Sequence, residues 1–336
     1  MIPAGIAARH RESWQGEMAE AITDPGQLLE ALALDPALLT PALAAAARFR
    51  LRVPRAFLAR MRHGDPHDPL LRQVLPIGEE LAEVAGYDGD PLGEAAANPA
   101  PGLLHKYRGR ALLVTTGACA VHCRYCFRRE FPYEAQVSDS GRWNEAIAAI
   151  AADTSIEEII LSGGDPLSLS NPRLAGLTAR LAAIPHLRRL RVHTRTPVVL
   201  PARVDEGLTA WLRALPWPVV IVVHANHAQE IDRPVAAAFQ RLHAAGARLL
   251  NQSVLLAGVN DSADALATLS TTLFDAGVLP YSLHLLDRVR GASHFDVPEA
   301  RARALMREIR ARLPGYLVPR LVREEAGAPG KTTVAD

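Results

Sequence analysis

Cysteine is scarce in this sequence. The 336 residues include only Cys119, Cys123 and Cys126, which fall within eight consecutive positions. Such a cluster leaves no second set of thiols to pair with, so we expect no disulfide framework and a reducing compartment, the cytoplasm. A structural zinc ion or an ordinary iron–sulfur cluster needs four ligands, so these thiols are one ligand short.

Long apolar runs and an excess of charge of one sign are missing as well. The first 20 residues contain no signal-peptide core, and no later stretch is long enough to cross a bilayer. Lysine and arginine number 37 against 36 aspartates and glutamates, a formal net charge of +1. The basic run at residues 48–63 is interpreted as a solvated helix face. The sequence therefore predicts a soluble protein with no membrane or nucleic-acid partner.

Strand-like and helix-like segments alternate through most of the chain. Residues 1–100 are rich in Ala, Leu and Pro and predict an N-terminal extension of short helices. The next part, residues 101–315, predicts βαβ units and a parallel sheet, arranged as an α/β partial (β/α)6 barrel. A doubly wound open sheet is the alternative. Residues 316–336 form a C-terminal segment. Short runs of Val, Ile and Leu mark six predicted strands at 111–116, 157–162, 190–194, 219–225, 247–256 and 279–286.

Unusual polar residues lie at the end of each predicted strand except the fifth, where they lie within it. The cysteines follow the first strand, and the later stretches are SGGDP (162–166), TRTP (194–197), HANH (224–227), NQS (251–253) and LLDRVRGASHF (285–295). The carboxyl ends of parallel strands share one face of an α/β fold, where active sites form. We therefore expect all of these residues around one rim.

The spacing Cys-x3-Cys-x2-Cys brings three thiolates to one face, which is enough for three corners of a cubane iron–sulfur cluster. The alternative is a zinc site completed by His122 or His105. His122 lies between two of the cysteines in the sequence, so its approach to the same metal would crowd the loop. An electron-carrier cluster would want a fourth thiolate, which the chain lacks.

This loop, with Tyr125 before its last cysteine, resembles that of the radical S-adenosylmethionine (SAM) enzymes. The resemblance implies a [4Fe–4S] cluster whose open iron is bound by the amino and carboxylate groups of SAM. The stretch SGGDP is similar to the family's strand end that holds the SAM amino group, formed here by Gly163, Gly164 and Asp165. Two further residues match family positions near SAM and are also compatible with ordinary strand-end polar residues: His224 and Gln252.

Several motifs narrow the resemblance to the lysine 2,3-aminomutase family. They are HCRYCFRREF, LSGGDPL, RTPVVLPAR, NQSVLLAGVND and GYLVPRLVREEAGAPGKTTV, and the match runs from Gly102 to Lys331. It fits best the short branch that makes β-lysine for elongation factor P. The resemblance implies an isomerase that uses the cluster, SAM and pyridoxal 5′-phosphate (PLP), with flavodoxin or ferredoxin as electron donor and a functional link to the factor's lysyl ligase.

The resemblance also assigns roles to individual residues. Lys331 matches the lysine that binds PLP, although its position alone would suggest a solvated tail lysine. Partners for the PLP phosphate are expected at Arg110 and Lys106, the latter an arginine in better-known aminomutases. For a lysine substrate, Arg128 matches the family's carboxylate partner. Asp287 matches an aspartate for the distal ammonium, and its expected companion is Glu324, where free-lysine aminomutases carry Asp.

Two other functions are compatible with parts of this pattern. One is an aminomutase for another amino acid, such as glutamate, although the acids Asp287 and Glu324 would repel a second substrate carboxylate. The other is a non-enzymatic iron–sulfur electron-transfer or sensor protein, which would leave Lys331 and the GGD turn without a role. The free-lysine enzymes carry further cysteines for a structural zinc near their assembly region. This chain lacks them, so we expect a monomer or simple dimer.

Overall fold

The computed structural model describes residues 14–136 and 142–334, and its first part is a helical extension that ends near residue 97. Prolines keep its helices short but also start them: Asp24 accepts a hydrogen bond from Gln27 N at 2.9 Å, and Pro25 occupies the first turn of α3. Residues 1–13 of the predicted extension lie outside the described part. The α-helices here are α2 (Trp14–Ala19), α3 (Pro25–Ala31), α4 (Leu39–Arg48) and α5 (Arg55–Leu58), and the 3-10 helices are η1 (Pro36–Leu38), η2 (Leu71–Gln73), η3 (Gly78–Leu81) and η4 (Glu94–Ala97).

A nine-stranded sheet follows, and its strands lie in the same order in space as along the chain. Strands β2 to β8 run parallel, whereas β1 and β9 pair antiparallel at the two edges. A sequential order contains no reversal point, so the doubly wound alternative is wrong and the predicted partial barrel is confirmed, with β8 as a seventh parallel strand. The strands are β1 (Leu103–Tyr107), β2 (Arg110–Thr116), β3 (Glu158–Gly163), β4 (Arg189–Thr194), β5 (Val219–Val223), β6 (Arg248–Val254), β7 (Leu279–His284), β8 (Arg320–Arg323) and β9 (Thr332–Thr333).

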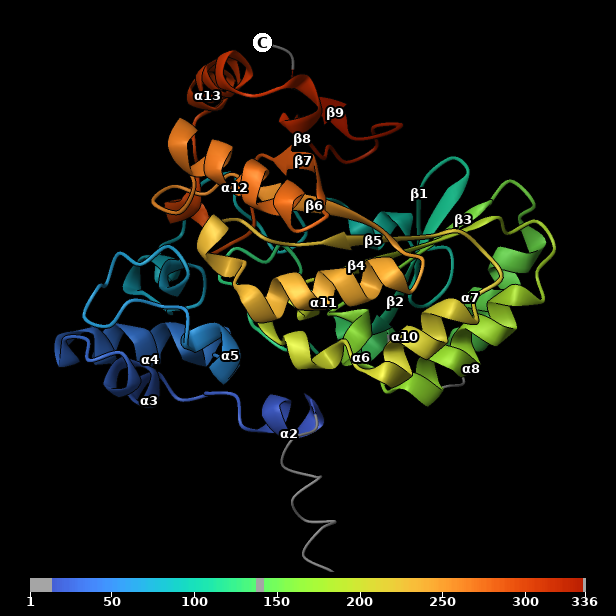
Figure 1. The fold of residues 1–336 in the computed structure, drawn as a ribbon, viewed down its shortest axis with the longest axis horizontal. Coiled ribbons are helices and arrows are strands. Elements are labelled where there is room, and N and C mark those ends of the chain that lie inside the picture. Colours follow the sequence, from blue (N-terminus) through green and yellow to red (C-terminus); the bar gives the residue numbers. More distant parts are fainter. Residues whose placement is uncertain (1–13, 137–141, 335–336) are drawn as a thin grey trace, which may run out of the picture.

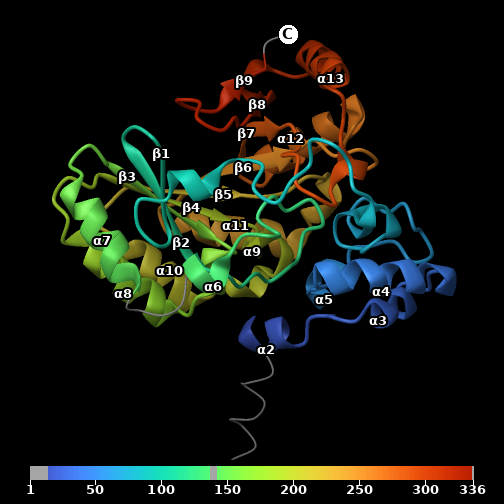
Figure 2. The same ribbon diagram turned by 180° about the vertical axis from the view of Figure 1, so that it is seen from behind.

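Amphipathic helices connect the parallel strands and pack their apolar faces on the outside of the sheet, where most of the main core lies. Figures 1 and 2 show them along the convex side of the sheet, with the blue N-terminal helices gathered at one end of the molecule. The α-helices are α6 (Tyr133–Gln136), α7 (Arg142–Ala152), α8 (Asn171–Ala182), α9 (Thr196–Val199), α10 (Glu206–Arg213), α11 (Arg233–Ala244), α12 (Ala263–Asp275) and α13 (Glu299–Arg312). The 3-10 helices are η5 (Pro166–Ser168), η6 (Pro201–Arg203), η7 (Ala228–Glu230), η8 (Ser293–Phe295) and η9 (Gly315–Leu317). None of the helices in the described ranges is long and apolar enough to cross a membrane.

The N-terminal extension packs directly against the cysteine loop. Its core, built around the fully buried Phe57, also contains Ala120 and Val121 of that loop. The backbone joins the two parts as well, because His122 N donates to Arg52 O at 3.0 Å and Arg124 N donates to Gln73 O at 2.9 Å. Apolar burial and these hydrogen bonds together fix the loop that carries the thiols.

Candidate active site

One cavity of about 610 Å³ opens at the carboxyl ends of the parallel strands. Its volume is in the range of small-molecule sites. Every residue that the sequence predicted for the site lines it, so the structure brings the whole predicted set together. They are Cys119, Cys123, Cys126, Gly163, Gly164, Asp165, His224 and Gln252, together with Lys106, Arg110, Arg128, Asp287, Glu324 and Lys331.

The three cysteines lie in the turns that follow β2. Cys126 N donates to Cys123 O at 3.1 Å, which folds the loop so that all three thiols border the cavity. Burial raises the pKa of the Cys119 thiol well above its ordinary value and that of Cys126 to about 11. Thiolates in this place therefore need a bound cationic centre to stabilise them, as iron would.

The two histidines that could have completed a zinc site contact other groups. His122 Nδ1 lies 2.9 Å from Arg50 O, and its ring lies 5.4 Å from that of Phe49. His105 Nδ1 lies 3.5 Å from an Asp153 carboxylate oxygen. The geometry therefore gives the zinc alternative no support.

The glycines of SGGDP let two backbone segments meet. A Cβ atom on Gly163, whose φ is +122°, would lie 2.6 Å from Thr116 O, and one on Gly164 would lie 2.5 Å from Ala118 O. Both positions exclude a side chain because the start of the cysteine loop occupies that space. The close approach expected between these glycines and a ligand is thus, in part, an approach to the cysteine loop itself.

Asp165 joins the end of β3 to the end of β4. Its buried carboxylate accepts hydrogen bonds from Thr194 Oγ1 at 2.7 Å, Arg195 N at 2.7 Å and Thr196 N at 3.0 Å, and it also caps η5. This carboxylate is therefore well supplied with donors, and its main role in the structure is to hold two strand ends together at the rim of the cavity.

Lys331 is held in the cavity by the last strand. It directly precedes β9, which pairs with β8 through Thr333 and Val322, and Val334 beyond it is buried. Lys331 Nζ lies 3.1 Å from His284 Nε2 and 3.4 Å from Gln252 Oε1. Burial lowers its pKa to about 8, although nearby acids oppose the shift. The interpretation as a solvated tail lysine is therefore wrong.

Two acidic side chains face the same end of the cavity and differ in their partners. Glu324 Oε1 lies 3.1 Å from Lys106 Nζ. Asp287 has no side-chain hydrogen bond or ion pair with any described residue, and burial together with the neighbouring Glu324 raises its pKa to about 7. A buried acid without a partner is suited to receive a cation from outside the protein.

The two residues predicted to bind the PLP phosphate also differ in whether they already form an ion pair. Lys106 is held between the carboxylates of Glu324 and Glu94, the latter at 3.4 Å. The Arg110 guanidinium lies 4.7 Å from the centre of the Tyr107 ring and forms no ion pair within the described residues. Arg110 is therefore the better placed of the two for a phosphate.

Arg128 is buried and already holds a carboxylate of the protein. Its Nε and Nη2 atoms each donate to Glu94 at 2.7 Å, and Nη1 donates to Ser162 Oγ at 3.1 Å. One N–H on each terminal nitrogen is left over, so the end of the guanidinium fork can still receive a second carboxylate. Glu94, the first residue of η4, aims this fork into the cavity, and the sequence analysis missed it because nothing marks a lone glutamate in the Ala-rich N-terminal extension.

Two neutral histidines with unused ring nitrogens lie between the cysteines and Lys331. Nε2 of His193 and Nε2 of His224 are buried without hydrogen-bond partners in the described chain. Burial lowers the pKa of both imidazoles, that of His224 to about 3. Such orphaned polar atoms normally have a partner when buried, so they indicate that a ligand belongs here. His193 was missed because it lies inside a predicted strand.

Arg195 is a further residue that the sequence analysis missed. It was seen only as part of the TRTP stretch, although its buried guanidinium contacts Cys123. A strand-end arginine looks like any solvated cation in a sequence, so only the fold reveals this contact.

Comparisons with known proteins agree with this site. The family model described as "Radical SAM superfamily" matches residues 113–269. The chain is 48% identical to "L-lysine 2,3-aminomutase" of Escherichia coli, over 96% of this chain and 94% of that protein. It is 46% identical to the protein of the same name from Haemophilus influenzae, over 100% of this chain and 99% of that protein. It is also 37% identical to that of Clostridium subterminale, over 85% of this chain and 68% of that one.

Proposed function

This chain belongs to the L-lysine 2,3-aminomutase family of radical SAM enzymes, and from that premise we propose that it moves the α-amino group of lysine to the β-carbon with PLP bound at Lys331. The position of Lys331 carries the proposal: its amine shares one cavity with three cysteines, and its pKa is lowered to about 8. A lysine that is partly neutral near pH 8 is a nucleophile able to bind an aldehyde cofactor.

The donor set fits the cofactors that the family implies. Cys119, Cys123 and Cys126 would hold three irons of a [4Fe–4S] cluster, with SAM at the fourth, and Arg110 would hold the PLP phosphate. When bound, the cluster with SAM supplies radical chemistry that activates an unreactive C–H bond, and PLP supplies a carbonyl carbon that keeps the amino nitrogen while it changes carbon. The orphaned ring nitrogens of His193 and His224 support this occupancy.

The residues of this chain would bind and orient the substrate. Arg128, held by Glu94, offers the end of its guanidinium fork to the substrate carboxylate, and the unpartnered Asp287 offers its charge to the distal ammonium. Both groups line the cavity, and Arg128 is itself buried, so a charge pair there is stronger than in solvent. A glutamate substrate would place its second carboxylate beside Asp287, which disfavours that alternative. Family membership makes the chain an isomerase, so a non-enzymatic electron carrier is no longer supported.

Covalent trapping tests the role of Lys331 directly. The chain contains two lysines, Lys106 and Lys331. After loading with PLP and reduction by borohydride, peptide mapping should find the pyridoxyl group on Lys331. Lys331→Arg should abolish labelling, whereas the matched variant Lys106→Arg should keep it and retain the charge beside Glu324. Labelling confined to Lys106 would overturn the assignment, and both variants should still bind about four irons per chain, as a cubane requires.

We further propose that β-lysine from this enzyme is attached to elongation factor P by its lysyl ligase, and that flavodoxin or ferredoxin delivers the electron. The motif resemblance to the short β-lysine-forming branch supports this, and the proposal places the enzyme in the cytoplasm together with these partners. The ligase and the factor would be incubated anaerobically with α-lysine, once with the enzyme and once without it. The mass of the factor should rise by one lysyl unit more readily in the incubation that contains the enzyme. Equal modification with and without the enzyme would contradict the link.

A further inference from the structure

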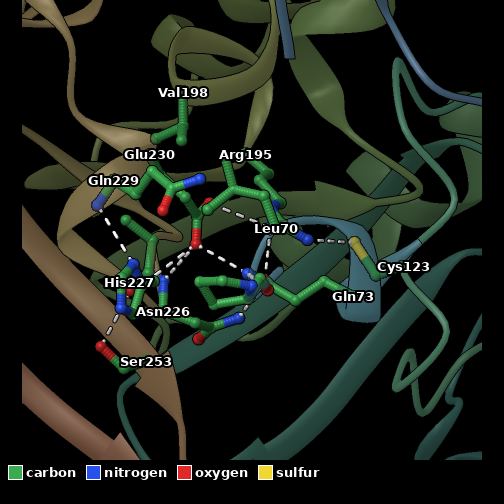
Figure 3. Close-up of polar contacts among 12 residues, drawn as sticks. Leu70, Gln73, Cys123, Arg195, Val198, Asn226, His227, Gln229, Glu230 and Ser253 are labelled. Atoms are coloured by element: carbon green, nitrogen blue, oxygen red, sulfur yellow. Dashed lines mark hydrogen bonds and ion pairs between the residues drawn. The ribbon is translucent and has the colours of Figure 1, made fainter. Parts of the chain in front are cut away.

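Arg195 is a buried cation that contacts the cysteine loop. It follows β4 at the start of α9, and 5% of its surface is exposed. Its Nη1 atom donates to Cys123 Sγ at 2.8 Å (Figure 3) and to the Tyr125 hydroxyl at 2.7 Å. In the described part of the chain no side chain donates a hydrogen bond to Cys119 or Cys126, although the backbone of Arg128 donates one to Cys126. The three thiols are therefore not equivalent, and Cys123 alone is joined to a guanidinium.

The other end of the guanidinium is fixed by a carboxylate. Arg195 Nη2 donates to Glu230 Oε2 at 3.0 Å and to Gln73 Oε1 at 2.6 Å. Glu230 is fully buried, and its other oxygen accepts hydrogen bonds from Asn226 N at 2.8 Å and His227 N at 3.1 Å. An ion pair so firmly hydrogen-bonded on both sides has a single geometry.

Gln73 and Asn226 complete this arrangement from opposite sides of the rim. Asn226 Nδ2 donates to Gln73 Oε1 at 2.9 Å and to the Tyr125 hydroxyl at 2.6 Å. Because Arg195 and Asn226 both donate to that hydroxyl, its own proton is left to point at Cys123. The N-terminal extension, which supplies Gln73, thus supports the iron-binding loop through the same network.

Hydrogen bonds to a cluster's cysteine sulfur stabilise its more electron-rich, reduced state and so raise its reduction potential. We propose that Arg195 is a positioning residue that sets the reduction potential of the cluster through Cys123, and that Glu230 limits this effect by compensating the charge of Arg195. The inference rests on the cluster of the proposed function and adds the residues that tune it. It applies to the step in which the cluster accepts its electron, because a cluster that is harder to reduce receives that electron less readily.

Two substitutions should move the potential in opposite directions. Arg195→Met removes the donors and the charge, so the midpoint potential should become more negative. Glu230→Gln keeps the shape of the side chain but leaves the charge of Arg195 uncompensated, so the potential should become more positive. Arg195→Lys keeps a cation and should give a smaller negative shift than Arg195→Met. Potentiometric titration of the reconstituted protein, followed by the electron paramagnetic resonance signal of the reduced cluster, measures each value.

Arg203 provides the matched control. It is also a fully buried arginine, but it donates to Leu167 O at 2.7 Å and Leu169 O at 3.0 Å and contacts no cysteine. Arg203→Met should lower the melting temperature without moving the potential. This separates tuning from a general loss of packing, which would not give shifts of opposite sign at Arg195 and Glu230.

The outcomes distinguish this inference from the proposed function. If wild-type protein binds no four-iron cluster, both fail. If the cluster binds but Arg195→Met and Glu230→Gln shift its potential in the same direction, or not at all, the inference alone fails. If Arg195→Met binds no iron, Arg195→Lys and Glu230→Gln decide: a negative shift in the first and a positive shift in the second support the inference, and any other pair of results overturns it.

Discussion

At the scale of single residues, the unusual feature of this site is an acid kept without a partner. The other carboxylates around the cavity are paired: Glu94 with Arg128, Glu324 with Lys106, and Asp165 with three donors. Among the carboxylates that line the cavity in the described part of the chain, Asp287 alone forms no side-chain hydrogen bond or ion pair, and its pKa rises to about 7 although the charges of Lys331 and Lys106 oppose the shift. A protein keeps such a costly group where a ligand supplies the missing charge, so we interpret Asp287 as the specificity residue for an ammonium substrate.

This interpretation predicts opposite effects of Asp287→Asn on stability and on function. The folded protein binds a proton at Asp287 up to about pH 7, whereas aspartates of an unfolded chain titrate near pH 4. The free energy of unfolding of the wild type should therefore fall as the pH rises from about 4 to 7, because the folded state holds a proton that the unfolded state has released. The variant has no such proton, so its free energy of unfolding should not show this fall. At pH 7.5 the variant without cofactors should be more stable by about 1–3 kcal/mol. Its turnover of lysine should nevertheless collapse.

Urea unfolding at pH 5 and pH 7.5 measures the stability part of this prediction. Glu324→Gln is the comparison variant: it removes a carboxylate already paired with Lys106, and because Glu324 also raises the pKa of Asp287, its gain in stability should be smaller than that of Asp287→Asn. A constant difference in stability between Asp287→Asn and wild type at the two pH values would show that Asp287 is not the uncompensated acid. Unchanged affinity of the variant for lysine would place the ammonium elsewhere.

How far the sequence predicts these residues depends on the signal each one leaves. The cysteines could be found by spacing, and Lys331 and Asp287 by resemblance to a family. Glu94 and Arg195 could not, because their roles arise from contacts between segments far apart in the chain, such as Arg195 with Gln73. The value of a buried ion pair depends on burial and partner geometry, and neither is written in a local pattern.

At the scale of elements, the C-terminal hairpin decides whether Lys331 reaches the site. β9 consists of two residues, and its hold on β8 is strengthened by Val334, which donates its N–H to Leu321 O at 3.0 Å and is buried in a core with α12 and α13. Two-residue strands are marginal without such packing. The tail is thus fixed by one apolar anchor beyond the lysine.

Loss of that anchor should release PLP and leave the cluster intact. Val334→Asp buries a charge without a partner, which costs several kcal/mol, so β9 should detach from β8. Bound PLP per chain, measured by absorbance after desalting, should fall severalfold, while iron per chain should stay at the wild-type value. Val334→Ala, which removes two methyl groups and adds no charge, should give a smaller loss of PLP. Equal PLP content in Val334→Asp and wild type would show that the hairpin does not position Lys331.

Strands β2 to β7 were predictable, whereas β8 and the two edge strands of the sheet were not. Strands β2 to β7 are buried, Val/Ile/Leu-rich runs bounded by helices, a pattern that follows from coverage on the outer face of the sheet. β1 and β8 carry charged residues and, like β9, lie at or near the edges, and β9 consists of two threonines and is too short to leave a pattern. Their pairing depends on the rest of the barrel being formed, so the local sequence carries little information about it.

At the scale of the whole molecule, the fold places the cysteine loop and Lys331 near opposite edges of the same sheet. The cysteine loop follows β2 near one edge of the sheet, and Lys331 precedes β9 at the other edge. Curvature of the sheet brings both to a single cavity, which the N-terminal extension supports behind the cysteines. In the function that we propose, the separation along the chain would allow iron and PLP to be bound independently, and the shared cavity would allow both to act on one substrate.

Transfer of nitrogen from one carbon of lysine to its neighbour is the central claim, and isotope tracing tests it most directly. Lysine labelled with ¹⁵N at the α-amino group would be incubated anaerobically with the reconstituted enzyme, SAM, PLP and a reductant, and the amino acids separated and analysed by ¹⁵N NMR. The account predicts β-lysine that carries the label on its β-carbon, with none formed by the Cys123→Ser or Lys331→Arg variants. SAM cleavage without any labelled β-lysine, or a β-amino acid formed from glutamate and not from lysine, would contradict it.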